Sequence, residues 1–138
     1  MSEYNFRQQV VKELTKAGLD AFSVENPSRP GTPDVNYIPG WIELKWLPKW
    51  PKQADTIVKI DHFTPQQRNF LRRRWNRGGP AHLLLRVGSR GSIENLLFEG
   101  PDASDFVGLV DREKLEALAV WHTFGKIKGA ELAEALAR

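Results

Sequence analysis

Residues 31–45 read GTPDVNYIPGWIELK, and this stretch decides how the rest of the chain is interpreted. It holds two short apolar segments joined by a Pro-Gly pair, which is typical of a tight turn. Because alternate residues of a strand share one face, we expect Glu43 and Lys45 to lie together, opposite the apolar side chains that enter the core. Asp34 begins the preceding strand, so it can reach the same position across the hairpin.

Length and composition point to one ordinary domain. The chain has 138 residues, enough to bury a core, and no cysteine, which excludes a disulfide framework and a thiolate metal site. No apolar run approaches the roughly 18 residues of a membrane span. The first residues also lack the charged and apolar regions of a signal peptide. We therefore expect an intracellular, cytoplasmic protein that makes no contact with membranes.

Positive charge is concentrated in residues 41–90. This segment holds eleven of the twenty Lys and Arg residues and only three acids, a net charge of +8 in a chain whose total is +3. Four of the five tryptophans also lie there. Basic residues interleaved with aromatic ones are typical of a surface that binds a polyanion. A solvated, soluble face is the alternative explanation for the charge alone.

Periodicity predicts an α/β fold in which helices flank a mixed central sheet. The hairpin meander is followed by a helical crossover to another strand. We expect a single domain over 1–138, with a core at about 3–98 and a C-terminal helical extension at about 104–138. The predicted helices are 3–17, 64–77, 111–121 and 129–137, the predicted strands are 20–25, 33–38, 41–46, 57–60, 81–87 and 93–98, and 99–102 is predicted as a loop.

The motif residues give the chain a family resemblance. Pro33-Asp34, followed by Glu43-Leu44-Lys45, resembles the signature of the PD-(D/E)XK nuclease superfamily. The Gly-x-Pro-Asp entry, the Trp-Ile-Glu-Leu-Lys strand and the later Thr-Pro-x-Gln helix start are similar to VRR-NUC and phage-type endonucleases, which resemble Holliday junction resolvases. The resemblance covers about residues 3–87. It implies a restriction-endonuclease-like core of helix, three strands, helix and strand.

The resemblance and the residue chemistry imply a metal site. Asp34 and Glu43 supply hard oxygen ligands that suit Mg²⁺ or Mn²⁺, and the superfamily adds the backbone carbonyl of Leu44. Such a metal polarises a phosphate and activates a bound water. An ordinary lysine is a poor base near neutral pH, so we expect Lys45 to orient the water or to stabilise charge on the phosphate.

Two further polar residues are implied as parts of the site. Glu3 corresponds to the acid that the family carries on its first helix, where it would join the metal ligands, and Glu13 is the competing acid on the same helix. An acid that complements the helix dipole is the alternative explanation of Glu3. Gln67 corresponds to the glutamine that follows the motif and helps to orient the lysine, with Gln66 as its natural control.

Phosphate contacts are expected along the second predicted helix and the segment before it. Such contacts add salt dependence and little sequence reading. Two tryptophans beside the motif can stack on unpaired bases, although packing within the fold explains them equally well. The candidates for contact with nucleic acid are Lys49, Lys52, Arg68, Arg72, Arg73, Arg74, Arg77, Trp46 and Trp50.

These features together predict a Mg²⁺- or Mn²⁺-dependent endonuclease that hydrolyses phosphodiester bonds in DNA. The resemblance makes branched DNA, such as four-way junctions or flaps, the expected substrate, and the compact size suits a phage protein. Symmetric cutting of two strands would require a homodimer. The alternative is a nucleic-acid-binding protein that uses the same fold without catalysis.

Overall fold

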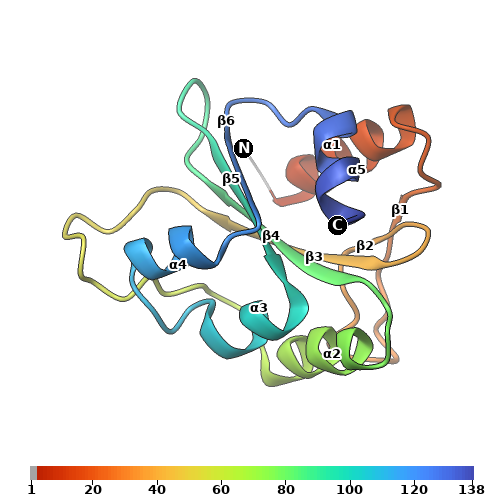
Figure 1. The fold of residues 1–138 in the computed structure, drawn as a ribbon, viewed down its shortest axis with the longest axis horizontal. Helices are drawn as coiled ribbons and strands as arrows, with labels where there is room; N and C mark the ends of the chain where they lie inside the picture. The colour runs from red at the N-terminus through yellow and green to blue at the C-terminus, as the bar shows by residue number, and fades with distance from the viewer. Residues whose placement is uncertain (1–2) are drawn as a thin grey trace.

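A single mixed sheet of six strands runs through the molecule (Figure 1). The computed structural model describes residues 3–138, with Glu3 described in its backbone only. The spatial order of the strands, β1 to β6, is also their order along the chain. Among the described strands, only β3 and β4 pair in parallel, because α2 carries the chain back between them. The strands are β1 (Phe22–Ser23), β2 (Val35–Asn36), β3 (Trp41–Leu47), β4 (Ala81–Val87), β5 (Glu94–Glu99) and β6 (Trp121–Phe124).

Helices cover both faces of this sheet, as Figure 1 shows. Two of them, α1 and α5, pack on one face, and the other three, α2, α3 and α4, pack on the opposite face. No helix among the described residues combines the length and apolarity needed to cross a bilayer. The helices are α1 (Glu3–Lys16), α2 (Pro65–Asn76), α3 (Gly100–Phe106), α4 (Arg112–Leu118) and α5 (Gly129–Leu136).

The first core lies between the sheet and the α1–α5 pair. Apolar side chains of α1 recur at helical spacing, with Phe6, Val10 and Leu14 all fully buried. They pack with Ile42 and Leu44 of β3 and with leucines of α5. A side-chain carbon at Gly129 would clash with the carbonyl oxygen of Glu13, so α1 and α5 touch backbone to backbone there.

The second core lies under α2, α3 and α4. Leu83 and Leu85 of β4 point into it, while Leu84 points into the first core, as strand alternation requires. Every residue of β4 is buried, which is typical of a central strand that is covered on both faces. The sheet therefore has no solvent-facing side at its centre, where β3 and β4 pair.

The predicted α/β class is confirmed, and the element order begins with helix, three strands, helix and strand. The structure matches the expected strand at 81–87 residue for residue. The expected strands at 20–25 and 33–38 shrink to two residues each. The expected strand at 57–60 is wrong, because only Ile57 forms an isolated bridge, to Asp111.

The C-terminal region differs most from expectation. Residues 99–102 are not a loop, because α3 begins at Gly100 with a proline in its first turn, where a missing N–H costs nothing. The helix expected at 111–121 ends at Leu118, and Trp121–Phe124 forms β6. Aromatic and β-branched residues suit a strand that can pair with β5. The predicted helical extension is thus part of the sheet and of both cores.

Candidate active site

The β2–β3 hairpin brings the two motif carboxylates together. Val35 pairs with Ile42, so the preceding residue, Asp34, lies opposite Glu43 on the same face. Asp34 Oδ2 accepts a hydrogen bond of 2.8 Å from the backbone N–H of Leu44. Its other oxygen, Oδ1, accepts one of 3.0 Å from Arg7 on α1. The Asp34 side chain is therefore held from two directions.

Glu43 is buried and only half satisfied. Its side chain is 2% exposed, and Oε2 lies 3.2 Å from Lys45 Nζ. Oε1 has no hydrogen-bond partner among the described residues. Burial raises the pKa of Glu43 well above its ordinary value, and the neighbouring charge of Asp34 raises it further. The two carboxylates thus favour either a shared proton or an added cation.

Lys45 uses all three of its donors within the protein. Besides Glu43, its Nζ donates to the carbonyl oxygen of His62 at 2.9 Å and to Gln67 Oε1 at 3.2 Å. His62 has a φ of 61°, a left-handed conformation in which its carbonyl meets the ammonium. The buried ammonium is thereby fixed in position.

Gln67 links the lysine to the start of α2. Thr64 caps this helix, and its hydroxyl accepts a bond of 3.1 Å from the Gln67 N–H. Gln67 Oε1 in turn accepts from the Thr64 N–H at 2.9 Å, which completes a capping box. The same oxygen receives Lys45. Gln66, the neighbouring control, is exposed.

Glu43 and Lys45 lie together, as expected, but the face of the sheet that carries them is covered. Lys45 is only 6% exposed, and its Nζ lies 5.6 Å from the centre of the Phe63 ring. The cause is the second helical layer, because α2 and the segment that leads into it cover the face that carries Glu43 and Lys45.

These residues fit a hard divalent cation. Glu43 Oε1 is a buried acceptor without a partner, next to a second carboxylate. The N–H and C=O of one strand residue project to the same side, so the carbonyl of Leu44 faces the Asp34 side as its N–H does. Two carboxylates and one carbonyl form an oxygen-only donor set of the kind that Mg²⁺ and Mn²⁺ prefer.

Two acids of α1, Glu3 and Glu13, were candidates to join the site. Glu13 does not reach the site, because its carboxylate lies 3.7 Å from Lys16 Nζ and its backbone packs against α5. It is also six residues beyond Arg7, about 9 Å along the helix. The Glu3 side chain lies outside the described residues. Its backbone is one helical turn before Arg7.

Sequence reasoning missed Arg7. This residue joins Asp34 to Glu25, with which it forms an ion pair at 3.3 Å. Asp34 and Arg7 are 27 residues apart, and Arg7 lies beside the apolar stripe of α1 rather than on it. Only a basic residue next to the buried stripe could have suggested that α1 places a cation beside the site.

The expected nucleic-acid contacts divide into two groups. Arg68 donates to the carbonyl of Ser104 at 3.0 Å, and Arg72 pairs with Asp105, so α3 already engages both. Trp46 and Trp50 donate their indole N–H groups to Gly88 and Glu94 within the fold. The remaining candidates are exposed and form no salt bridge with an acid in the described part of the chain: Lys49, Lys52, Arg73, Arg74 and Arg77.

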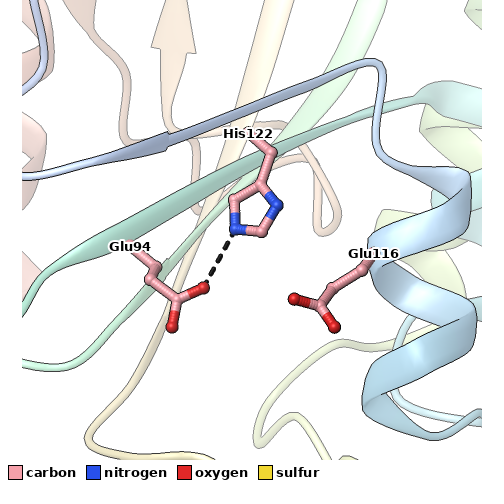
Figure 2. A group of neighbouring side chains, drawn as sticks. All are labelled: Glu94, Glu116 and His122. Atoms are coloured by element: carbon pink, nitrogen blue, oxygen red, sulfur yellow. Dashed lines mark hydrogen bonds and ion pairs between the residues drawn. The ribbon is translucent and has the colours of Figure 1, made fainter.

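A second carboxylate cluster lies between the sheet and α4 (Figure 2). Glu94, Glu116 and His122 present ligand atoms within 4.8 Å of one another, the only such trio among the described residues. His122 Nε2 lies 2.9 Å from Glu94 Oε2, and Arg112 lies within 3.6 Å of both carboxylates. Because Arg112 already supplies positive charge there, this cluster is an ion-pair network that joins β5, β6 and α4.

Comparison of the chain with known protein families, with curated proteins and with solved structures finds no match. A proposal about function therefore rests on the fold, the geometry of the site and the motif resemblance.

Proposed function

We propose that this protein is a Mg²⁺- or Mn²⁺-dependent endonuclease that hydrolyses phosphodiester bonds in DNA. The observation that carries the proposal is the buried carboxylate of Glu43, which has an oxygen without a partner in the described part of the chain and lies beside half-buried Asp34 and a fixed lysine. A pair of carboxylates in this condition gains stability when it binds a divalent cation. Structural ion pairs do not need an unsatisfied oxygen.

Each residue has a role that follows from its contacts. Asp34, Glu43 and the Leu44 carbonyl would hold the metal, which when bound polarises the phosphate and lowers the pKa of a water. Lys45 would turn part of its hydrogen bonding toward a phosphate oxygen and stabilise charge that develops there. Gln67 keeps Lys45 in position, and Arg7 keeps Asp34 oriented. The exposed lysines and arginines would contact the DNA backbone.

The same proposal includes a branched DNA substrate and a homodimeric state. Branched DNA follows from the motif resemblance, and two symmetric cuts would need a homodimer. The apolar face of α5 is already buried against α1, with Leu132 and Leu136 inside the core. A dimer interface in the C-terminal region would therefore use surfaces other than this face.

One observation favours a second function, which is DNA binding without cleavage. All three donors of Lys45 are occupied by protein groups, and its side chain is 7% exposed. A substrate phosphate must displace at least one of these bonds. Cleavage assays separate the two functions directly.

The test is cleavage of supercoiled plasmid, linear duplex, flap and four-way-junction DNA with Mg²⁺ or Mn²⁺, and with EDTA. We expect metal-dependent cutting that Asp34→Asn and Glu43→Gln each slow at least about 100-fold, since each loses several kcal/mol of transition-state stabilisation. DNA binding in EDTA should persist in both variants. Glu116→Gln is the matched control, because it alters a carboxylate of the second cluster.

If no substrate is cut in a metal-dependent way, the endonuclease proposal is wrong and DNA binding without cleavage is the remaining function. Full activity in Glu43→Gln, or a comparable loss in Glu116→Gln, would show that the active site lies elsewhere.

A further inference from the structure

A separate hollow opens at the other end of α2. It has a volume of about 470 Å³, which lies within the range of roughly 300–1,000 Å³ typical of small-molecule sites. Its walls come from the β2–β3 turn, the last turn of α2, the start of β4 and the end of α5. We call it the Tyr37–His82 pocket; its lining includes Leu19, Tyr37, Ile38, Trp75, His82 and Leu136.

Two polar groups in this apolar wall lack partners. The Tyr37 hydroxyl and His82 Nδ1 are buried, and neither has a hydrogen-bond partner among the described residues. Each side chain is only 2% exposed. Buried polar atoms are nearly always paired, so two orphans in one pocket wall point to a ligand that pairs them.

Both groups are neutral near physiological pH. Burial lowers the pKa of His82 to about 4 and raises the pKa of Tyr37 to about 12. The pocket therefore suits an uncharged ring with donors and acceptors along its edge, rather than an ion. Trp75 stands edge-on to the His82 ring, with centroids 5.4 Å apart, and adds aromatic surface for such a ring.

A basic hollow adjoins this pocket. It has a volume of about 360 Å³ and is lined by Arg73, Arg74, Arg77 and Gly79, and Gly79 also lines the Tyr37–His82 pocket. All three arginines are exposed, and none forms a salt bridge with an acid in the described part of the chain. We call it the arginine hollow. It offers several guanidinium groups to one anion.

We propose that the two hollows together bind a nucleotide, with its base in the Tyr37–His82 pocket and its phosphate in the arginine hollow. An uncharged heterocycle joined to an anion matches an apolar, aromatic cavity that continues into a cluster of arginines. The site lies at the opposite end of α2 from Gln67, so it does not depend on the cleavage chemistry. The nucleotide is either a free mononucleotide or an unpaired nucleotide of a DNA strand.

Calorimetric titration of the full chain in EDTA tests the proposal, with deoxyadenosine monophosphate, deoxyadenosine and inorganic phosphate as probes. We expect the monophosphate to bind at least about tenfold more tightly than either fragment, because only it fills both hollows. Failure of the monophosphate to bind at millimolar concentration would overturn the proposal. Equal affinity for deoxyadenosine would overturn the role of the arginine hollow.

Variants locate the binding. Ala133→Phe places a ring in the pocket from α5, and Arg77→Ala removes a surface guanidinium from the arginine hollow. Each should weaken binding of the monophosphate about tenfold, while Arg90→Ala, in the exposed β4–β5 turn, should leave it unchanged. Because Arg77 is on the surface, its variant tests the proposal even if Ala133→Phe does not fold. Unchanged affinity in Arg77→Ala would contradict the proposal.

Competition identifies the source of the nucleotide. If a duplex with one unpaired adenosine displaces the monophosphate more effectively than a fully paired duplex does, the natural ligand belongs to a strand. If the two duplexes compete equally weakly, it is a free nucleotide. Glu43→Gln should bind the monophosphate normally, so failure of the endonuclease proposal and failure of this one remain distinguishable.

Discussion

At its first turn α2 meets Lys45 and, through it, Glu43, whereas at its last turn it meets His82 and the Tyr37–His82 pocket. Both ends hold buried polar atoms that lack a partner among the described residues. At the first end the unpaired atom belongs to a carboxylate beside a second carboxylate, and at the other end the unpaired atoms belong to uncharged rings. The two proposals differ because these atoms differ: we propose a cation beside the carboxylates and an uncharged ring at the other end.

The largest effect is expected when the ammonium group of Lys45 is removed from the first end of α2. Lys45→Met removes the partner of Glu43 and three hydrogen bonds, and should lower the free energy of unfolding by about 3–5 kcal/mol at pH 7. Urea denaturation in EDTA measures the change. Lys59→Met, which alters an exposed lysine, is the control and should cost less than about 0.5 kcal/mol. A loss below about 1 kcal/mol in Lys45→Met would mean that the buried pair is not ionised.

At the last turn of α2, buried His82 should make the free energy of unfolding depend on pH. The pKa of His82 is about 4 in the folded chain, below its ordinary value of 6.5. Between these two values the unfolded chain binds a proton at His82 that the folded chain does not bind. The stability from neutral His82 is complete above pH 6.5 and is lost as pH falls toward 4. This loss is about 3 kcal/mol, from about 1.4 kcal/mol per pKa unit. Urea denaturation across this range should give a flatter profile for His82→Leu, and identical slopes would contradict the assignment.

The smallest effects on stability are expected from single substitutions at the two ends of α2. Thr64→Ala removes the N-cap, and Gly78→Ala forces a side chain onto a φ of 88°, so each should cost about 1 kcal/mol. Only Thr64→Ala removes a hydrogen bond of Gln67, the one that the Thr64 hydroxyl accepts from the Gln67 N–H, and so weakens the capping box of the residue that holds Lys45. We therefore expect similar urea midpoints but slower DNA cleavage in Thr64→Ala alone. An equal loss of cleavage in both variants would assign the effect to general stability.

Local sequence patterns predicted the hairpin well. Asp34 directly precedes β2 and Glu43 lies on β3, so the alternation of side chains and a tight turn are enough to bring them together. The start of α2 was equally readable, because Thr64 and Pro65 are a cap and a first-turn proline that act within one turn. For the hairpin pairing and the start of α2, whose determinants are close in sequence, the prediction and the structure agree.

Contacts set by the docking of distant elements were not predictable. Arg68 was expected to reach DNA, but α3, whose first residues were expected to be a loop, accepts its hydrogen bonds. One missed helix thus changed the interpretation of residues more than thirty positions away. Arg7 and the burial of Lys45 have the same origin, because both depend on the packing of helices against the sheet rather than on local periodicity.

The order of strands in the sheet also bears on synthesis of the protein. Each strand pairs with the strand made just before it, so the sheet can grow as the chain leaves the ribosome. The helix α1 is the exception, because its apolar face is completed by α5 from the far end of the chain. Nascent chains must therefore carry Phe6, Val10 and Leu14 incompletely covered until residues 129–136 emerge. The window for recognition by a chaperone thus lasts at least from the synthesis of α1 to the synthesis of α5.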